Sequence, residues 1–190
     1  KRFDREKADA GYLRYRMVSG LTILDTGDTA SDRERWSYLL LADELRRRSS
    51  RSRQDLAELY GRMVFNALIS NVDDHPRNHA LVAPGRSFQL SPAYDLTPTP
   101  LVSEEKRDLT LIVGEFNRYA NRINLRSGHA RFQLTRDEAS AIIDRIQAVV
   151  RARWYAVLRD SGTSEADCER VRPAFDYPGF ELDPAVVLQR

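Results

Sequence analysis

Cysteine is almost absent from this chain, and its scarcity excludes two classes of small protein. Cys168 is the only cysteine among 190 residues. The chain can therefore form neither an internal disulfide nor a zinc cluster built from cysteines. Proteins without disulfides are typical of a reducing compartment, so we expect a cytoplasmic location.

An excess of one charge and long apolar runs are also missing. The formal net charge is +2, which gives no reason to expect a nucleic-acid or membrane surface. Runs such as 39–42 and 111–113 are far too short to cross a bilayer, so we expect no membrane association. The chain opens directly with Lys1-Arg2-Phe3-Asp4, in what reads as a strand, and we expect it to be part of a longer protein.

The spacing of apolar residues predicts a mostly helical chain with a small β-hairpin. Helices are expected over 32–48, 52–69, 135–159 and 164–171. Ser52 with Asp55, and Thr135 with Glu138, match the pattern of side-chain caps at a helix start. The 135–159 helix should face the core with Ala139, Ile142, Ile143, Ile146, Val149, Val150, Trp154 and Val157.

Extended and irregular segments fill the remainder. Pro84-Gly85-Arg86 indicates a hairpin between 80–83 and 88–90, and three prolines exclude regular structure from 91–100. Further expectations are a strand ending at residue 5, a loop-rich linker over 6–31, a strand over 109–113, and an extended or partly disordered tail beginning near residue 173.

Three oxygen-bearing side chains stand in loops beside strong secondary structure: Asp73, Asn78 and Asp95. Phosphoryl transfer from ATP needs a carboxylate to orient the attacking hydroxyl and oxygen ligands to hold magnesium on the phosphates. In kinases the first ligand follows the catalytic aspartate by five positions, and a second comes after a hairpin. Taken alone, Asp73-Asp74-His75 is more often a solvated turn, but the combined order favours a site.

His75 and His79 lie four residues apart and raise the alternative of a zinc site. That geometry needs an uninterrupted helix with a glutamate after the first histidine. Pro76 follows His75 here, so we do not favour this alternative. A role as a hydrogen-bonding loop residue is at least as good an interpretation for His79.

Two separated motifs resemble the HipA family of bacterial toxin kinases. They are Phe65-Asn66-Ala67-Leu68-Ile69-Ser70-Asn71-Val72-Asp73-Asp74-His75-Pro76-Arg77-Asn78-His79 and Leu90-Ser91-Pro92-Ala93-Tyr94-Asp95-Leu96. The opening Arg2-Phe3-Asp4-Arg5 is similar to the hinge strand of that family. The resemblance implies the C-terminal lobe of a protein-kinase-like fold.

The resemblance also implies roles for individual residues. Asp73 would be the catalytic base, and Asn78 and Asp95 the ligands of Mg²⁺. The remaining contacts to ATP would come from the backbone of residues 1–3 at the adenine and from His75, Pro76, Arg77 and Tyr94 near the phosphates or metal. Arg77 stands where well-known members carry lysine, so its phosphate contact would differ in geometry.

The implied organisation and partners follow from the same resemblance. The partner would be a HipB-like helix-turn-helix antitoxin, with DNA bound only through it, and the substrate a serine or threonine of a protein. A glycine-rich phosphate loop, a strand lysine and the regulatory phosphorylation site are expected before residue 1. The expected units are the hinge-strand end (1–5), linker (6–31), helical lobe (32–174) with catalytic loop (72–79) and metal-binding loop (91–100), and tail (175–190).

Three alternatives remain open from the sequence. The chain could be a non-catalytic module that binds an antitoxin or another subunit, or a kinase-like enzyme acting on a lipid or small molecule. The basic residues at 46–48, 51 and 53 could also contact DNA phosphates directly. For these we favour a solvated helix end that complements the helix dipole.

Overall fold

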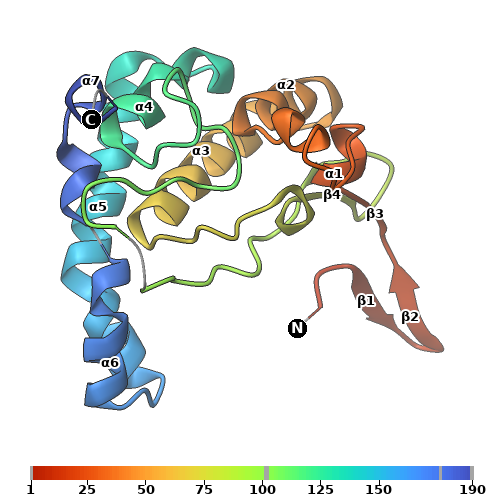
Figure 1. The fold of residues 1–190 in the computed structure, drawn as a ribbon. Coiled ribbons are helices and arrows are strands. Elements are labelled where there is room, and N and C mark those ends of the chain that lie inside the picture. Colours follow the sequence, from red (N-terminus) through yellow and green to blue (C-terminus); the bar gives the residue numbers. More distant parts are fainter. Residues whose placement is uncertain (1, 101–102, 176, 189–190) are drawn as a thin grey trace.

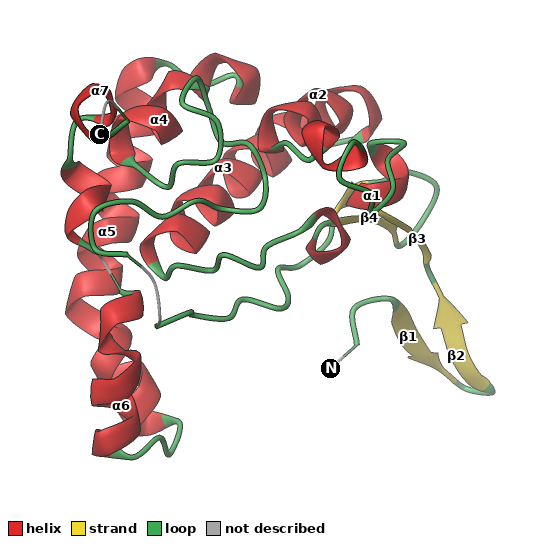
Figure 2. Cartoon of the chain, viewed as in Figure 1, coloured by secondary structure: helices red, strands yellow, loops and turns green. Residues whose placement is uncertain are grey.

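Helices predominate over strands in the described chain, as the sequence predicts (Figures 1 and 2). The computed structural model describes residues 2–100, 103–175 and 177–188. The α-helices are α1 (Gly20–Ile23), α2 (Tyr38–Arg48), α3 (Ser52–Leu68), α4 (Arg122–Ser127), α5 (Arg136–Asp160), α6 (Glu165–Val171) and α7 (Pro184–Val187). Short 3-10 helices are η1 (Asp32–Arg35), η2 (Pro76–Asn78), η3 (His129–Phe132), η4 (Arg172–Ala174) and η5 (Pro178–Glu181).

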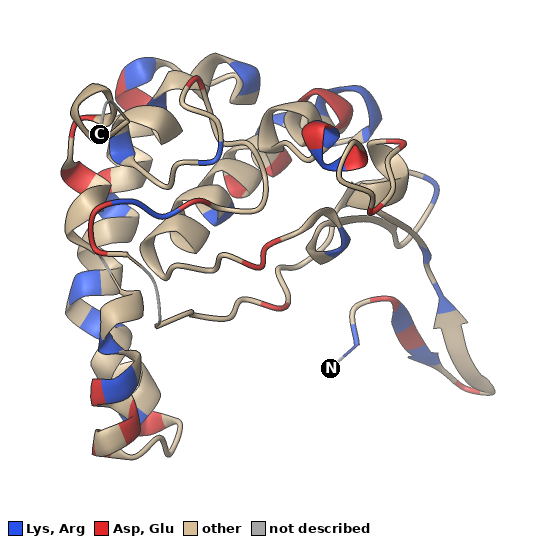
Figure 3. Cartoon of the chain, viewed as in Figure 1, with Lys and Arg blue, Asp and Glu red and all other residues tan. Residues whose placement is uncertain are grey.

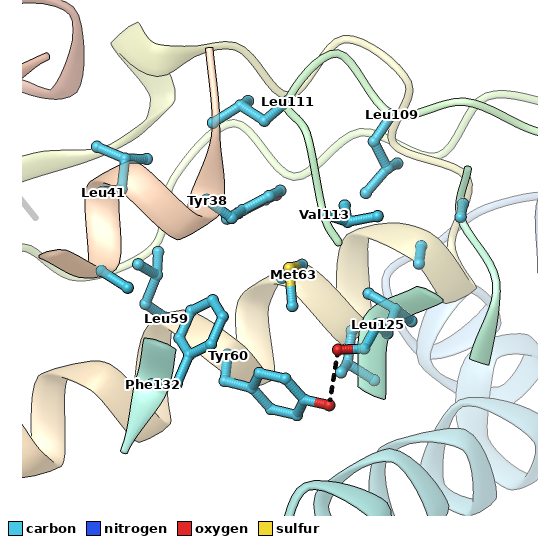
Figure 4. Close-up of a cluster of buried hydrophobic side chains, with 14 of the residues drawn as sticks. Tyr38, Leu41, Leu59, Tyr60, Met63, Leu109, Leu111, Val113, Leu125 and Phe132 are labelled. Carbon is cyan, nitrogen blue, oxygen red and sulfur yellow. Dashed lines mark hydrogen bonds between the residues drawn. The ribbon is translucent and has the colours of Figure 1, made fainter. Parts of the chain in front are cut away.

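Helix α3 lies at the centre of the molecule and supplies much of its core. Its apolar side chains pack with residues of α2, α4, η3 and the segment 109–113 (Figure 4). Tyr60 makes an edge contact with Phe132, at 5.1 Å between ring centroids, and its hydroxyl donates to the carbonyl of Leu125 at 3.2 Å. Full burial of such large side chains is the main stabilising contribution expected for a domain of this size.

Two small antiparallel sheets stand beside the helices. Strands β1 (Arg5–Ala8) and β2 (Gly11–Arg14) form a hairpin that projects away from the helical body in Figure 1. Strands β3 (Arg16–Ser19), β4 (Ala80–Ala83) and β5 (Gln89–Leu90) form the second sheet, with β4 in the middle. The predicted hairpin between 80 and 90 is thus confirmed.

The interval 6–31 is not the loop that the sequence predicts. It contains most of β1 and all of β2, β3 and α1. The strand predicted to end at residue 5 begins there instead. The side chains of β2 are exposed on both faces. Because neither face is buried, the sequence carries no apolar alternation that would indicate a strand.

The single helix predicted over 32–48 is correct only for Tyr38–Arg48, which forms α2. The chain forms η1, leaves the helical path at Trp36 and Ser37, and starts α2 at Tyr38. Here the backbone pairs with residue 112: Tyr38 N–H donates to the Ile112 carbonyl at 3.0 Å, and Ile112 N–H to Trp36 at 2.8 Å. These partners replace helical hydrogen bonds, and the Ser37 hydroxyl caps α2.

The 109–113 segment is correspondingly not a strand. Its one β-type pairing is the isolated bridge between Ile112 and Ser37. The Ser52 cap is also wrong, because helix α3 begins at Ser52 without a side-chain cap. Asp55 instead accepts from the Ser49 hydroxyl at 2.6 Å and the Leu90 N–H at 2.7 Å.

Helix α5 is confirmed with its predicted capping pair, Thr135 and Glu138. Its core face differs from the predicted one, since Val149 and Val157 are about half exposed, at 50% and 49%. Val149 lies off the buried face, which runs through Ala139, Ile143, Gln147 and Val150. Val157 belongs to the end of α5, which extends beyond the body beside α6 in Figure 1.

The predicted extended tail is wrong for the described part of the C-terminal region, which contains η4, η5 and α7; residues 176, 189 and 190 lie outside the described residues. Tyr177 and Phe180 are buried in the core. The side-chain amide of Asn121 donates to three carbonyls of this region, those of Gly179, Phe180 and Leu182. Among the residues described, no helix is both long enough and apolar enough to span a membrane.

Candidate active site

The loop between α3 and β4 carries most of the predicted site residues. After Leu68 the chain reverses at Ser70, whose φ of 55° is left-handed, and the Asn71 N–H donates back to the Asn66 carbonyl at 2.9 Å. Pro76 then opens η2, because its fixed φ suits a first helical position. The side chain of Asp73 is exposed and that of Asn78 is almost buried, at 6% exposure.

A second loop, after β5, carries Tyr94 and Asp95. It starts where the Ser91 N–H donates to the Ala80 carbonyl at 2.9 Å and the Arg62 guanidinium donates to the Ser91 carbonyl at 2.6 Å. Asp95 adopts a left-handed backbone, with φ 59°, and its side chain is exposed.

The two loops contact each other through hydrogen bonds. The Tyr94 hydroxyl donates to the Arg77 carbonyl at 2.6 Å, and the Asn71 amide makes a longer contact of 3.4 Å to the Asp95 carbonyl. Burial raises the pKa of the Tyr94 hydroxyl above its ordinary value, so it remains a donor near neutral pH. The segments that carry Asp73 and Asp95 therefore adjoin; that both side chains share one cation with Asn78 stays a prediction.

Phe3 reaches this site from the start of the chain. Its ring stacks on Tyr94, with 5.4 Å between centroids and 26° between planes. A hollow opens beside this pair, between the β1–β2 hairpin and the second loop; it is lined by Arg2, Phe3, Arg5, Glu6, Lys7, Tyr12, Tyr15, Pro92, Ala93 and Tyr94. Lys1, for which an adenine contact is predicted, lies outside the described residues. Phe3 lines the hollow.

Arg77 forms an ion pair that the sequence does not predict. Its guanidinium donates two hydrogen bonds to the carboxylate of Asp28, one of them at 2.9 Å. These bonds hold the pKa of Asp28 below its ordinary value, and His75 and Arg33 add a smaller effect of the same sign. The two partners are 49 residues apart, so no local pattern connects them.

The two histidines of the first loop have different surroundings. His79 is buried and its Nε2 lies 2.9 Å from a carboxylate oxygen of Asp74, which agrees with a hydrogen-bonding role. His75 is partly buried, and its Nδ1 has no hydrogen-bond partner. Over the described ranges no three His, Cys, Asp or Glu side chains are grouped closely enough to hold a metal.

The basic residues at the end of α2 are mostly paired within the chain. Arg47 and Arg48 contact Glu44 at 2.6 and 2.7 Å, and Arg51 contacts Asp55 at 3.0 Å. Figure 3 shows acidic and basic positions interspersed along α2. This pairing favours the interpretation as a solvated helix end over direct contact with DNA.

Comparison with known proteins agrees with the resemblance of the two motifs. The sequence profile of the HipA-like C-terminal domain matches residues 1–154. No curated protein matches in a sequence search. Among solved structures, the chain is similar to one from Shewanella oneidensis MR-1, described as the toxin-antitoxin system HipA, HipB and its operator DNA complex.

This structural similarity extends over nearly the whole chain at low sequence identity. The TM-score is 0.70 with 16% identity, and the match covers 92% of this chain and 45% of the Shewanella chain. At this identity the similarity shows a shared fold. The chain thus spans less than half of that structural relative.

Proposed function

The chain belongs to the family of HipA-like C-terminal domains, and on this premise we propose that it is the catalytic lobe of a kinase. The proposed reaction is ATP- and Mg²⁺-dependent phosphoryl transfer to a serine or threonine of a protein. The biological role would be that of the toxin in a type II toxin-antitoxin pair.

One observation carries this proposal: the loop with Asp73 and the loop with Asp95 are hydrogen-bonded to each other, and both carboxylates are exposed. A kinase needs a carboxylate near the attacking hydroxyl and a second one on the metal. In the proposed arrangement Asp73 would accept the proton of the attacking serine or threonine hydroxyl, and ADP would be the leaving group as that hydroxyl oxygen takes up the phosphoryl group. Asp95 and Asn78 would hold the cation.

The available ligands suit magnesium bound together with a nucleotide. Mg²⁺ prefers oxygen ligands, keeps several waters, and is commonly held by one or two carboxylates plus substrate phosphates. Asp95 offers a carboxylate and Asn78 an amide oxygen. When bound, Mg-ATP supplies the transferable γ-phosphoryl group and the charge neutralisation on its oxygens.

Arg77 is the proposed cation beside the phosphates. Its planar guanidinium can donate two parallel hydrogen bonds, a geometry that suits a carboxylate or a phosphate. In the structure the Arg77 guanidinium donates its two hydrogen bonds to the Asp28 carboxylate. Binding of a phosphate at Arg77 would therefore replace one bidentate anionic partner by another.

A HipB-like antitoxin is the proposed protein partner. The similar Shewanella structure is described as a complex of HipA with HipB and operator DNA. The paired arginines at the end of α2 give no reason for direct DNA contact, so any DNA would be bound through the antitoxin. Co-purification of the two gene products would test the partnership.

The decisive experiment uses the protein as its gene encodes it, so that any residues encoded before Lys1 are included. Transfer of radiolabelled phosphate from ATP to proteins and to lipids of the source organism is measured. Asp73→Asn should lower the rate by about 100-fold or more, the range typical for loss of a general base. The matched control is Asp160→Asn, an exposed aspartate at the end of α5.

Each outcome separates the competing functions. A wild-type rate in Asp73→Asn would exclude this residue as the base. Label in lipids but not in proteins would favour a lipid phosphotransferase. Failure of the wild-type protein to bind Mg-ATP in a calorimetric titration would favour a non-catalytic binding module.

A further inference from the structure

A buried polar cluster underlies the first loop, and the proposed reaction does not use it. Its centre is Asp74, which is 1% exposed. One oxygen of this carboxylate, Oδ2, accepts a hydrogen bond from the Tyr38 hydroxyl and lies 2.9 Å from Nε2 of His79. Burial of a carboxylate is costly unless donors compensate it, so these contacts are strongly favoured.

The positions of the two partners in the loop are informative. Asp74 directly follows Asp73, and His79 directly follows Asn78. The contact between Asp74 and His79 therefore joins the residue after the proposed base to the residue after the proposed metal ligand. This contact holds the two ends of the 73–79 segment together.

Tyr38 anchors this closure to the helical core. It is the first residue of α2 and has no exposed surface. Its ring packs edge-on against His79 at 5.4 Å, and the Asn66 amide donates to its hydroxyl at 3.0 Å. The Asn71 amide in turn donates to the Asn66 side chain at 3.1 Å, so α2, α3 and the loop share one network.

We propose that Asp74 is a positioning residue: through Tyr38 and His79 it fixes the relative placement of Asp73 and Asn78. This inference rests on the proposed kinase function. The mechanism is geometric. The buried contacts of Asp74 with Tyr38 and His79, here called the clamp, hold the backbone at the positions next to Asp73 and Asn78. In catalysis, displacement of a reacting group by about 1 Å can cost about 100-fold in rate.

The protonation of Tyr38 agrees with its place in the clamp. Burial, together with the Asp74 carboxylate, raises the pKa of the Tyr38 hydroxyl well above its ordinary value. The hydroxyl therefore stays protonated and remains a donor to Asp74. An ionised Asp74 can only accept, so the His79 tautomer that fits this contact carries its hydrogen on Nε2. Nδ1 of His79 has no hydrogen-bond partner among the described residues.

The test removes the Tyr38 hydroxyl, which donates to Asp74, and keeps the packing of the Tyr38 ring. Asp74→Ala would leave both partners buried and unsatisfied and could unfold the protein, so Tyr38→Phe is the informative variant. Tyr60→Phe is the matched control, because Tyr60 is also fully buried and donates to a carbonyl, that of Leu125, away from the loop. His79→Gln and His79→Leu form a second pair, in which glutamine retains a donor.

Two measurements are made on the protein as its gene encodes it. Hydrogen exchange of the amides of residues 70–80, without nucleotide, should accelerate in Tyr38→Phe and not in Tyr60→Phe. In the kinase assay, kcat and kcat/KM should fall together by about tenfold in Tyr38→Phe, as expected when only transition-state geometry is lost. His79→Gln should retain more activity than His79→Leu.

The outcomes keep this inference separate from the proposed function. If the wild-type protein is inactive but the loop loosens in Tyr38→Phe alone, the clamp stands and the kinase assignment fails. Unchanged loop exchange in Tyr38→Phe overturns the clamp. If hydrogen exchange of the loop accelerates in Tyr38→Phe while kcat stays at the wild-type value, the positioning role of Asp74 is overturned.

Discussion

The ion pair between Asp28 and Arg77 shows how one contact at the residue scale can be tested without any assay of activity. The guanidinium lowers the pKa of the Asp28 carboxyl. The pair therefore contributes stability above the ordinary pKa of aspartate, and that contribution is lost as the pH falls through the lowered value. In a carbon-13 NMR titration Asp28 should titrate below an ordinary aspartate, and in Arg77→Gln it should return upward. A titration that is the same in both proteins would contradict the pairing.

Gly20 permits the close approach of α1 to the loop that follows α3. Its N–H donates to the His79 carbonyl at 2.6 Å, and a Cβ at this position would lie 2.5 Å from the Pro76 carbonyl oxygen. Gly20→Ala should therefore displace η2 and lower the free energy of unfolding by about 1–3 kcal/mol, the usual cost of overpacking. Urea denaturation measures this change.

Gly85→Ala is the control for that experiment. A Cβ at Gly85 would meet no atom within 4 Å, so the substitution should leave stability nearly unchanged. If Gly20→Ala and Gly85→Ala are equally stable, the prediction is wrong, and the backbone near Pro76 can shift to accept the added Cβ without a loss of stability.

At the scale of single elements, the start of α5 depends on a reciprocal cap. The Thr135 hydroxyl accepts from the Glu138 N–H at 3.2 Å, and the Glu138 carboxylate accepts from the Thr135 N–H at 2.8 Å. Thr135→Ala should cost about 1 kcal/mol, typical for loss of a helix cap. Thermal unfolding followed by circular dichroism checks this value. Ser140→Ala, at a partly exposed position about one turn further on, should have a much smaller effect.

The elements also show what the sequence could predict. Helices α3 and α5 are recoverable because apolar residues repeat at helical spacing and, for α5, a capping pair marks the start. Strands β1 and β2 are not recoverable, since their side chains are exposed on both faces and leave no periodic signal. The break before α2 depends on pairing with Ile112, which lies 74 positions after Tyr38 in the chain.

The same limit applies to the candidate site. Spacing and motif order lead to Asp73, Asn78 and Asp95, because these signals are local. They do not lead to Asp28 or Tyr38, whose contacts with the loop span 49 and 36 residues. Long-range contacts of single polar side chains leave no pattern in one sequence.

At the scale of the whole molecule, the C-terminal region is part of the core. Phe180 has no exposed surface and packs in the main hydrophobic cluster. Phe180→Ala should lower the free energy of unfolding by roughly 3–5 kcal/mol, a large share of the stability of a typical domain. Chemical denaturation provides the measurement. Val186→Ala, at a position 56% exposed, serves as the control and should change little.

This region also contacts the first turn of the loop that follows α3. The Ser70 hydroxyl donates to the Ala174 carbonyl at 2.6 Å, and the buried Arg107 donates to the Ser70 hydroxyl and, at 2.8 Å, to the Pro173 carbonyl. The chain between Ser70 and Ala174 is 104 positions long. During translation, Ser70 emerges from the ribosome long before its partner has been synthesised. The turn that opens the loop therefore acquires these contacts only after residue 174 has been synthesised.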